Sequence, residues 1–225
     1  MFQGSFWVYL FLFLMFSAVV VWGSFDIELG YFVNSFTHKR TKIKEVALTF
    51  DDGPTEFTPK FLDILKENNV KATFFCIGKQ IEKYPETFQR IILEGHTIGN
   101  HTYSHSNNTG FLSTQKMIEE IEKCDEIMLK VGNIKTNLYR PPFGVTNPNI
   151  AKAIKKTHKN SIGWNIRSLD TITENEKKIF RKVTKNLKKG SVILLHDTSE
   201  KTYNVLVDLL LFLKDKKYST FTIDK

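Results

Sequence analysis

The chain divides into one long apolar run and a remainder in which short apolar runs alternate with amphipathic stretches. Residues 1–25 carry no charged side chain, and nearly every position from Phe6 to Trp22 is apolar. An apolar run without a polar face is typical of a membrane span or a signal peptide, not of a core helix. We therefore expect residues 1–23 to be a signal peptide or an N-terminal membrane anchor, residues 24–44 to be a linker, and residues 45–225 to form one folded domain.

Beyond residue 45, the apolar runs have the length of buried strands, and the stretches between them have helical periodicity. The expected strands are Val46–Phe50, Ala72–Ile77, Thr97–His101, Leu138–Pro141, Ser161–Ile166, Val192–His196 and Thr220–Ile223. The expected helices are Thr58–Asn68, Gln80–Glu94, Thr114–Val131, Asn147–Thr157, Glu174–Leu187 and Thr202–Lys214. This alternation predicts an α/β fold with parallel strands, most simply a distorted (β/α)7 barrel that resembles the TIM type. A doubly wound open sheet is the alternative.

The charge of the chain indicates which binding partners to expect, and its two cysteines indicate whether a disulfide is present. The 32 Lys and Arg residues exceed the 24 Asp and Glu residues, so the formal net charge is +8, all of it beyond the apolar run. Such a surface suits an anionic cell wall or membrane surface, or is simply a solvated lysine-rich exterior. No motif that reads nucleic acid accompanies the charge, so we expect no nucleic-acid partner, and we expect a monomer. Cys76 and Cys124 lie in apolar contexts and predict buried side chains without a disulfide.

Polar residues gather at the ends of the expected strands, where a barrel of this type places its active site. Asp51 and Asp52 follow the first strand, and His101 ends the third, with His105 four residues later. One carboxylate and two imidazoles suit a catalytic Zn²⁺, which keeps a position open for water or substrate. The second carboxylate is then free to act as a base. The pattern predicts metal-assisted hydrolysis.

Four segments at these strand ends resemble, in order and in spacing, the signature motifs of a known family. They are Thr49-Phe50-Asp51-Asp52-Gly53-Pro54, His101-Thr102-Tyr103-Ser104-His105, Arg140-Pro141-Pro142-Phe143 and Ile193-Leu194-Leu195-His196. From about residue 44 to 224 the chain is similar to the polysaccharide deacetylases of carbohydrate esterase family 4, with its NodB-type homology domain. The resemblance makes residues 45–225 a catalytic domain with a distorted (β/α) barrel. It implies metal-dependent hydrolysis of a linear amide, the N-acetyl group of GlcNAc-containing polysaccharides such as peptidoglycan or chitin-like oligomers.

The resemblance also implies a role for each site residue. Asp52, His101 and His105 would bind a divalent metal, Zn²⁺ or Co²⁺. Asp51 would be the general base, Arg140 its charged neighbour, and Asp170 the partner of that arginine. His196 would be the acid that protonates the departing amine. The backbone N–H of Phe143 would stabilise the oxyanion, and Ile193 and Leu195 would lie at the substrate with it.

The backbone has to bring these side chains together. Adjacent strand residues point to opposite faces, so Asp51 and Asp52 reach one site only if the chain bends, and Gly53-Pro54 is expected to supply the bend. His101 and His105 share a face if their segment turns helically after the strand.

One stretch departs from the family pattern and leaves three functions open. Where a typical member has Asp-x-x-Asp-Trp, this chain has Arg167-Ser168-Leu169-Asp170-Thr171. Thr171 replaces the tryptophan that walls the acetyl-methyl pocket, so we expect a looser pocket or one filled by another side chain, such as Trp164. The leading function is an N-deacetylase. The alternatives are an O-acetyl esterase on a xylan-type glycan, and a catalytically silent wall-binding protein.

The location depends on two opposed signals. Lys39, Arg40, Lys42 and Lys44 follow the apolar run, and the positive-inside rule would keep them in the cytoplasm. The implied substrates lie outside the membrane. We therefore expect the domain to be extracytoplasmic, either membrane-anchored or secreted after Gly23.

Overall fold

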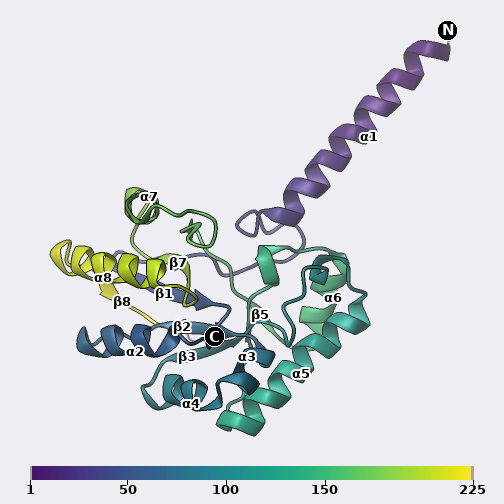
Figure 1. Ribbon diagram of the computed structural model, residues 1–225. Helices are drawn as coiled ribbons and strands as arrows, with labels where there is room; N and C mark the ends of the chain where they lie inside the picture. Colours follow the sequence, from purple (N-terminus) through teal and green to yellow (C-terminus); the bar gives the residue numbers. More distant parts are fainter. Residues whose placement is uncertain (1, 224–225) are drawn as a thin grey trace.

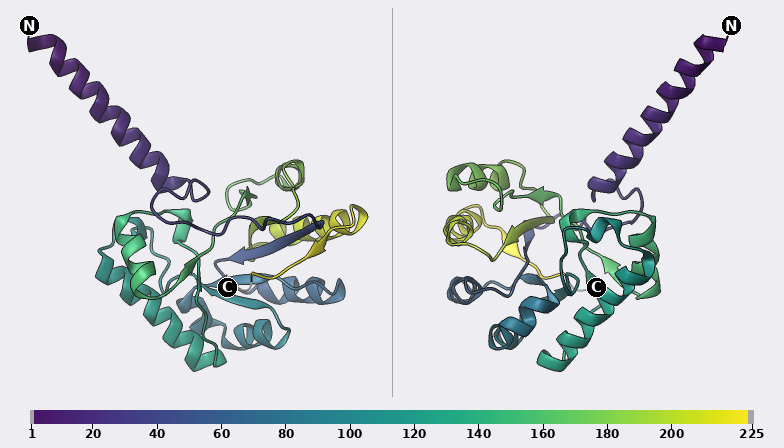
Figure 2. Two further views of the ribbon diagram at one scale, coloured as in Figure 1. Left: turned by 180° about the vertical axis from the view of Figure 1, so that it is seen from behind. Right: turned by 45° about the vertical axis from the view of Figure 1, so that its right-hand side comes forward.

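A single apolar helix projects from the folded part of the chain. A computed structural model describes residues 2–223 of the protein. Helix α1 (Phe2–Phe25) extends alone, away from the strands and the other helices (Figures 1 and 2). Its stretch Phe6–Phe25 is long and apolar enough to cross a membrane, and only 6% of that stretch is buried. This helix is therefore not a core helix of the folded part.

The strands form an incomplete parallel ring, in which the edge strands β5 and β6 are not paired with each other. In chain order they are β1 (Glu45–Asp51), β2 (Thr73–Cys76), β3 (Thr97–Asn100), β4 (Leu138–Tyr139), β5 (Asn160–Ser161), β6 (Ile166–Arg167), β7 (Ser191–His196) and β8 (Ser219–Thr220). The hydrogen-bonded order is β5-β4-β3-β2-β1-β7-β6, and β8 pairs with the beginning of β1. The two ends of this sheet, β5 and β6, are consecutive in the chain. This cyclic order confirms the distorted (β/α)7 barrel and is not that of a doubly wound open sheet.

Helices cover the outside of the ring and fix which residues face inward (Figure 1). They are α2 (Thr58–Glu67), α3 (Gly78–Lys83), α4 (Pro85–Leu93), α5 (Thr114–Gly132), α6 (Pro148–Lys156), α7 (Glu176–Lys185) and α8 (Glu200–Asp215). Val46, Leu48 and Phe50 of β1 are fully buried in the main core cluster with residues of α2, α4, α5 and α8. Burying each such side chain stabilises the fold by about 1.5–3 kcal/mol. Because side chains alternate along a strand, Thr49 and Asp51 consequently face the barrel interior.

Two predicted elements are each divided in the structure. The predicted helix Gln80–Glu94 is two helices, α3 and α4, because Pro85 has no N–H to donate and restricts the backbone of Tyr84. The predicted strand Ser161–Ile166 is two short strands, β5 and β6. Residues 163–165 between them lie outside the strands, and there the carbonyl oxygens of Ile162 and Gly163 accept hydrogen bonds from the guanidinium of Arg140. Cys76 and Cys124 are free and buried, as predicted.

The residues that precede β1 lie against the barrel. We call residues 26–44 the seam segment, because it reaches residues on both sides of the short strand β6. Phe36 forms a parallel bridge with Ile162, and His38 forms an antiparallel bridge with Ser191. Ile27 and Val33 are buried in the same part of the chain. The expected linker is thus packed onto the domain along its length.

Candidate active site

The two adjacent carboxylates at the end of β1 face one cavity because the chain changes direction between them. Asp51 is the last residue of β1 and is 3% exposed. Asp52 has a φ of 73°, a left-handed conformation that short polar residues tolerate better than most others. Gly53 follows where a Cβ would lie only 2.4 Å from a carboxylate oxygen of Asp197. The bend therefore begins at Asp52, one residue earlier than predicted, and Gly53-Pro54 continues it.

The two histidines come together through a loop, so the predicted helical turn is wrong. His101 directly follows β3, and Thr102 and His105 have positive φ values of 65° and 47°. Asn100 and Thr102 hold this loop: the Asn100 Oδ1 accepts the Thr102 N–H at 2.9 Å, and the Thr102 Oγ1 accepts the His105 N–H at 3.1 Å. As a result the two imidazole centroids lie 4.7 Å apart.

Asp52, His101 and His105 form a candidate metal centre. Asp52 Oδ1 lies 3.5 Å from Nε2 of each histidine, and the three ligand atoms lie within 4.8 Å of one another. Asp52 Oδ1 is buried and has no hydrogen-bond partner among the described residues. Nδ1 of His101 lies 2.8 Å from the carbonyl oxygen of Arg140, which leaves Nε2 free to present its lone pair. Burial lowers the pKa of His105 to about 4, so the His105 ring is neutral at pH 7. The set fits a divalent cation with open coordination positions.

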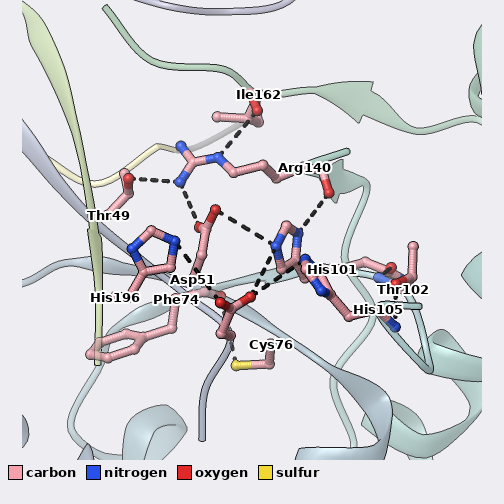
Figure 3. Close-up of polar contacts among 12 residues, drawn as sticks. Thr49, Asp51, Phe74, Cys76, His101, Thr102, His105, Arg140, Ile162 and His196 are labelled. Carbon is pink, nitrogen blue, oxygen red and sulfur yellow. Dashed lines mark hydrogen bonds and ion pairs between the residues drawn. The ribbon is translucent and has the colours of Figure 1, made fainter. Parts of the chain in front are cut away.

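Arg140 holds Asp51 in place. The guanidinium is fully buried, and its Nη1 donates to Asp51 Oδ1 at 2.7 Å and to Thr49 Oγ1 at 2.8 Å. The second oxygen, Asp51 Oδ2, lies 3.7 Å from Nε2 of His101 (Figure 3). A charge-assisted hydrogen bond thus fixes one oxygen of Asp51, while the other faces the candidate metal centre.

His196 ends β7 and is paired with Asp170. Nδ1 of His196 lies 2.8 Å from Asp170 Oδ1, and the His196 backbone N–H donates to Asp170 Oδ2 at 2.8 Å. Burial by itself would lower the pKa of His196, but the hydrogen bond and charge of Asp170 outweigh it, and the pKa is raised to about 9. Asp170 also accepts hydrogen bonds from the hydroxyl groups of Ser168 and Thr202. Burial by itself would raise the pKa of Asp170, but its hydrogen bonds and the charge of His196 outweigh burial and hold that pKa below the ordinary value.

The predicted pairing of Asp170 with Arg140 is therefore wrong. In the described part of the chain, all the hydrogen bonds of the Arg140 guanidinium go to Thr49, Asp51, Ile162 and Gly163. Leu169, with a φ of 60°, turns the chain after β6, and the Asp170 side chain meets the end of β7. The two carboxylate–cation pairs of the site are Asp51 with Arg140 and Asp170 with His196.

The candidate metal ligands, Asp51 and His196 border a small cavity. Its volume is about 190 Å³, and it is lined by Asp51, Asp52, His101, His105, Phe143, Trp164, Arg167, Thr171, Leu194 and His196. Pockets that hold drug-sized ligands are larger, about 300–1,000 Å³, so this cavity suits one small substituent of a larger molecule. Phe143 is 44% exposed at its edge, with its ring 4.7 Å from that of His105.

Two residues expected at the substrate are instead in the core. Ile193 and Leu195 are fully buried in the main hydrophobic cluster, whereas Leu194 between them lines the cavity. The reason is the alternation of side chains along β7, which places Leu194 on the same face as His196. The sequence alone shows that Leu194 and His196 are two residues apart and therefore share a face of the strand. Trp164 also lines the cavity and packs on Gly144, where a Cβ would lie 2.6 Å from the indole.

The site thus has the composition of a hydrolase with a candidate metal centre, and comparison with known proteins agrees. Residues 38–162 match the family described as polysaccharide deacetylase, and the chain belongs to that family.

Three similar proteins illustrate the relationship. The chain is 43% identical over 155 residues to a peptidoglycan-N-acetylglucosamine deacetylase of Bacillus cereus, covering 68% of this chain and 56% of that protein. It is 32% identical over 196 residues to the peptidoglycan-N-acetylmuramic acid deacetylase PdaA of Bacillus subtilis, covering 85% and 74%. A crystal structure of a peptidoglycan N-acetylglucosamine deacetylase superimposes with a TM-score of 0.78 at 37% identity, covering 84% and 90%. The chain spans about half the length of the first of these relatives.

Proposed function

We propose that the chain is a metal-dependent N-deacetylase that removes acetyl groups from the amino sugars of peptidoglycan. The observation that carries this proposal is the placement of two separate carboxylate–cation pairs around one candidate metal centre. Asp51 with Arg140 supplies a base, and Asp170 with His196 supplies an acid. Nε2 of His196 lies 3.9 Å from Asp52, so both pairs meet at the same cavity. Binding alone requires neither a base nor an acid.

The residues of the cavity divide the reaction between them. A divalent cation held by Asp52, His101 and His105, Zn²⁺ or Co²⁺, would polarise the acetamide carbonyl and acidify the attacking water. Asp51 accepts the proton of that water through the oxygen that Arg140 leaves free. His196 then donates its proton to the departing amine.

Three further features belong to this division of roles. Asp170 keeps His196 in the imidazolium form at neutral pH, because it raises the pKa of the ring to about 9. The backbone N–H of Phe143 is assigned to the developing oxyanion. Thr171 and Leu194, with Trp164, form the wall for the acetyl methyl group.

The substrate and the location follow from the relatives and from α1. Both curated relatives named above act on peptidoglycan amino sugars, so a glycan that contains GlcNAc is the proposed substrate. This polymer lies outside the cytoplasmic membrane, and α1 has the length and composition of a signal or anchor segment. We place the domain outside the membrane, anchored or secreted, with the net charge of +8 facing the anionic cell wall.

Acetate release tests the proposal. Peptidoglycan, GlcNAc oligomers and acetylxylan are each treated with the protein after chelation and after addition of Zn²⁺ or Co²⁺. Release of acetate with an equal amount of free amine, restored by the metal, is the expected result. Acetate from acetylxylan alone would identify an O-acetyl esterase, and no acetate from a metal-loaded protein would identify a silent wall-binding protein. Asp51→Asn should lower the rate of release by roughly 10²–10⁴, whereas Asp63→Asn, the same change on the exposed side of α2, should leave it unchanged.

A further inference from the structure

Arg167, the last residue of β6, lines the catalytic cavity but has no part in the chemistry described above. Its register partner on β7 is Leu194, which lines the same cavity. Its guanidinium carbon lies 5.7 Å from the centroid of the Trp164 ring. A cation over an aromatic face is held without the use of its N–H donors. Arg167 therefore presents a charged group beside the place proposed for the acetamide.

The hydrogen-bond donors of Arg167 are available to a ligand. Its side chain is exposed, and within residues 2–223 its guanidinium makes no hydrogen bond or ion pair. Arg140 differs in burial and in bonding, since it is fully buried and donates to four groups of the protein. Arg167, which lines the cavity, keeps its donors free. A free guanidinium is a planar fork of donors, and its geometry matches a carboxylate.

The carboxylates of the cavity do not serve as the counter-ion of Arg167. Asp51 is bonded to Arg140, and Asp52 faces His101 and His105. A negative group of the substrate can therefore reach Arg167 without displacing a protein partner of that side chain. Such a group would lie close to the acetamide, because the cavity measures only about 190 Å³.

The chemistry of peptidoglycan provides such a charge on one of its two amino sugars. The acetamido group is attached to C2, and a substituent on O3 belongs to the next ring carbon. N-acetylmuramic acid carries a lactyl ether on O3, and its carboxylate is free wherever no peptide is attached. N-acetylglucosamine has only a hydroxyl there. We propose that Arg167 binds this lactyl carboxylate, and that the chain selects peptide-free N-acetylmuramic acid over N-acetylglucosamine.

This inference rests on the proposed deacetylase function and names the sugar on which that function acts. Thr171 supports it, because a threonine in the cavity wall leaves room beside the acetamide that a tryptophan would fill. An attached peptide converts the carboxylate into a neutral amide, which cannot form a charge-assisted pair with Arg167. Glycan that still carries its peptides is therefore expected to be the poorer substrate.

The test compares two glycans that differ only in the charged group. Peptide-free strands are used with the lactyl carboxylate intact and after its chemical reduction to an alcohol, and kcat/KM is measured by acetate release. The full-length protein should prefer the intact strands by about 10-fold or more, as expected for a hydrogen bond to a charged group. Arg167→Gln should bring this ratio close to one, chiefly through KM, and Arg167→Lys should retain part of it. Arg181→Gln, which removes an exposed arginine of α7, should keep the full ratio.

A binding measurement separates this inference from the proposed function. Calorimetric affinities for the two glycans are compared between Asp51→Asn and the double variant Asp51→Asn/Arg167→Gln. If no glycan releases acetate, the deacetylase function is wrong, and an affinity ratio that depends on Arg167 still supports carboxylate binding. The inference is overturned by a wild-type kcat/KM ratio near one together with an Asp51→Asn affinity ratio near one, or by a ratio that Arg167→Gln leaves unchanged.

Discussion

Replacing Asp170 by Asn tests whether this carboxylate keeps His196 protonated. Asp170 Oδ1 lies 2.8 Å from Nδ1 of His196, and Oδ2 accepts the backbone N–H of the same residue. Asparagine has nearly the same shape and keeps one acceptor oxygen, so the substitution removes the charge with little loss of packing. We expect His196 to lose its proton at a lower pH in the variant.

The size of the effect follows from the pKa of His196. This pKa is raised from 6.5 to about 9, with Asp170 as the main cause opposing burial. At 1.36 kcal/mol per unit, the shift is worth about 3 kcal/mol in favour of the imidazolium. If the pKa returns to its ordinary value, the protonated fraction at pH 8 falls from about nine-tenths to about three-hundredths, and kcat/KM falls about 30-fold.

The assay is the pH profile of kcat/KM for acetate release. For the wild type, the alkaline limb should lie near pH 9, and for Asp170→Asn it should move toward pH 6.5. Thr202→Val is the matched control, because it removes a hydrogen bond to Asp170 at 3.0 Å and leaves the charge in place. An alkaline limb that stays near pH 9 in Asp170→Asn would refute the reasoning.

The same pair has a consequence for folding stability. Since the pKa of His196 is higher in the folded state than in the unfolded state, the pair stabilises the protein fully below about pH 6.5. This contribution is lost as the pH rises through about 9. Urea unfolding should therefore show a larger loss of stability for Asp170→Asn at pH 6 than at pH 9.5.

Three further predictions concern the metal, the buried arginine and the location. Purified protein should hold about one divalent ion by elemental analysis, and His101→Ala should lose it. Asp51→Asn should keep the ion but lose turnover by roughly 10²–10⁴. A metal-free protein that still hydrolyses acetamides would contradict this prediction. Arg140→Met should lower the free energy of unfolding by about 3–5 kcal/mol, because it leaves Asp51 buried without its partner, and an unchanged urea midpoint would exclude that role. Protease treatment of intact cells should remove an anchored domain, and the medium should contain a secreted one; a domain that resists until lysis and is absent from the medium would place it inside.

The alternation of apolar runs and the polar strand ends were sufficient to predict the barrel and a metal-binding group of one carboxylate and two imidazoles. Both depend on strand periodicity, which the sequence displays directly. The choice of Asp52 and not Asp51 as the third ligand came from the family resemblance. His101 and His105 were correctly grouped, although the loop that joins them is not helical. Its left-handed residues are held by the Asn100 side chain, and sequence spacing alone does not reveal such a contact.

Two of the errors depend on contacts between distant parts of the chain. Asp170 was correctly placed at a strand end, but its partner is decided by the turn at Leu169. The predicted strand Ser161–Ile166 has a suitable apolar pattern, yet two of its carbonyl oxygens accept hydrogen bonds from Arg140, which directly follows β4. In contrast, the position of Leu194 could have been predicted, because residues two apart on a strand, such as Leu194 and His196, lie on the same face.

The seam segment determines the smallest unit that can fold. A chain cut at residue 45 would lose the bridges of Phe36 and His38 and expose the unpaired side of β5, an edge of the kind that promotes aggregation. Cleavage after Gly23 has no such effect, because Ser24 and everything after it stay attached, including the hydrogen bond from the Thr146 N–H to the Ser24 carbonyl oxygen. Retention on α1 and release by a signal peptidase would therefore yield the same catalytic body, and the chain could change its mode of attachment without changing its fold.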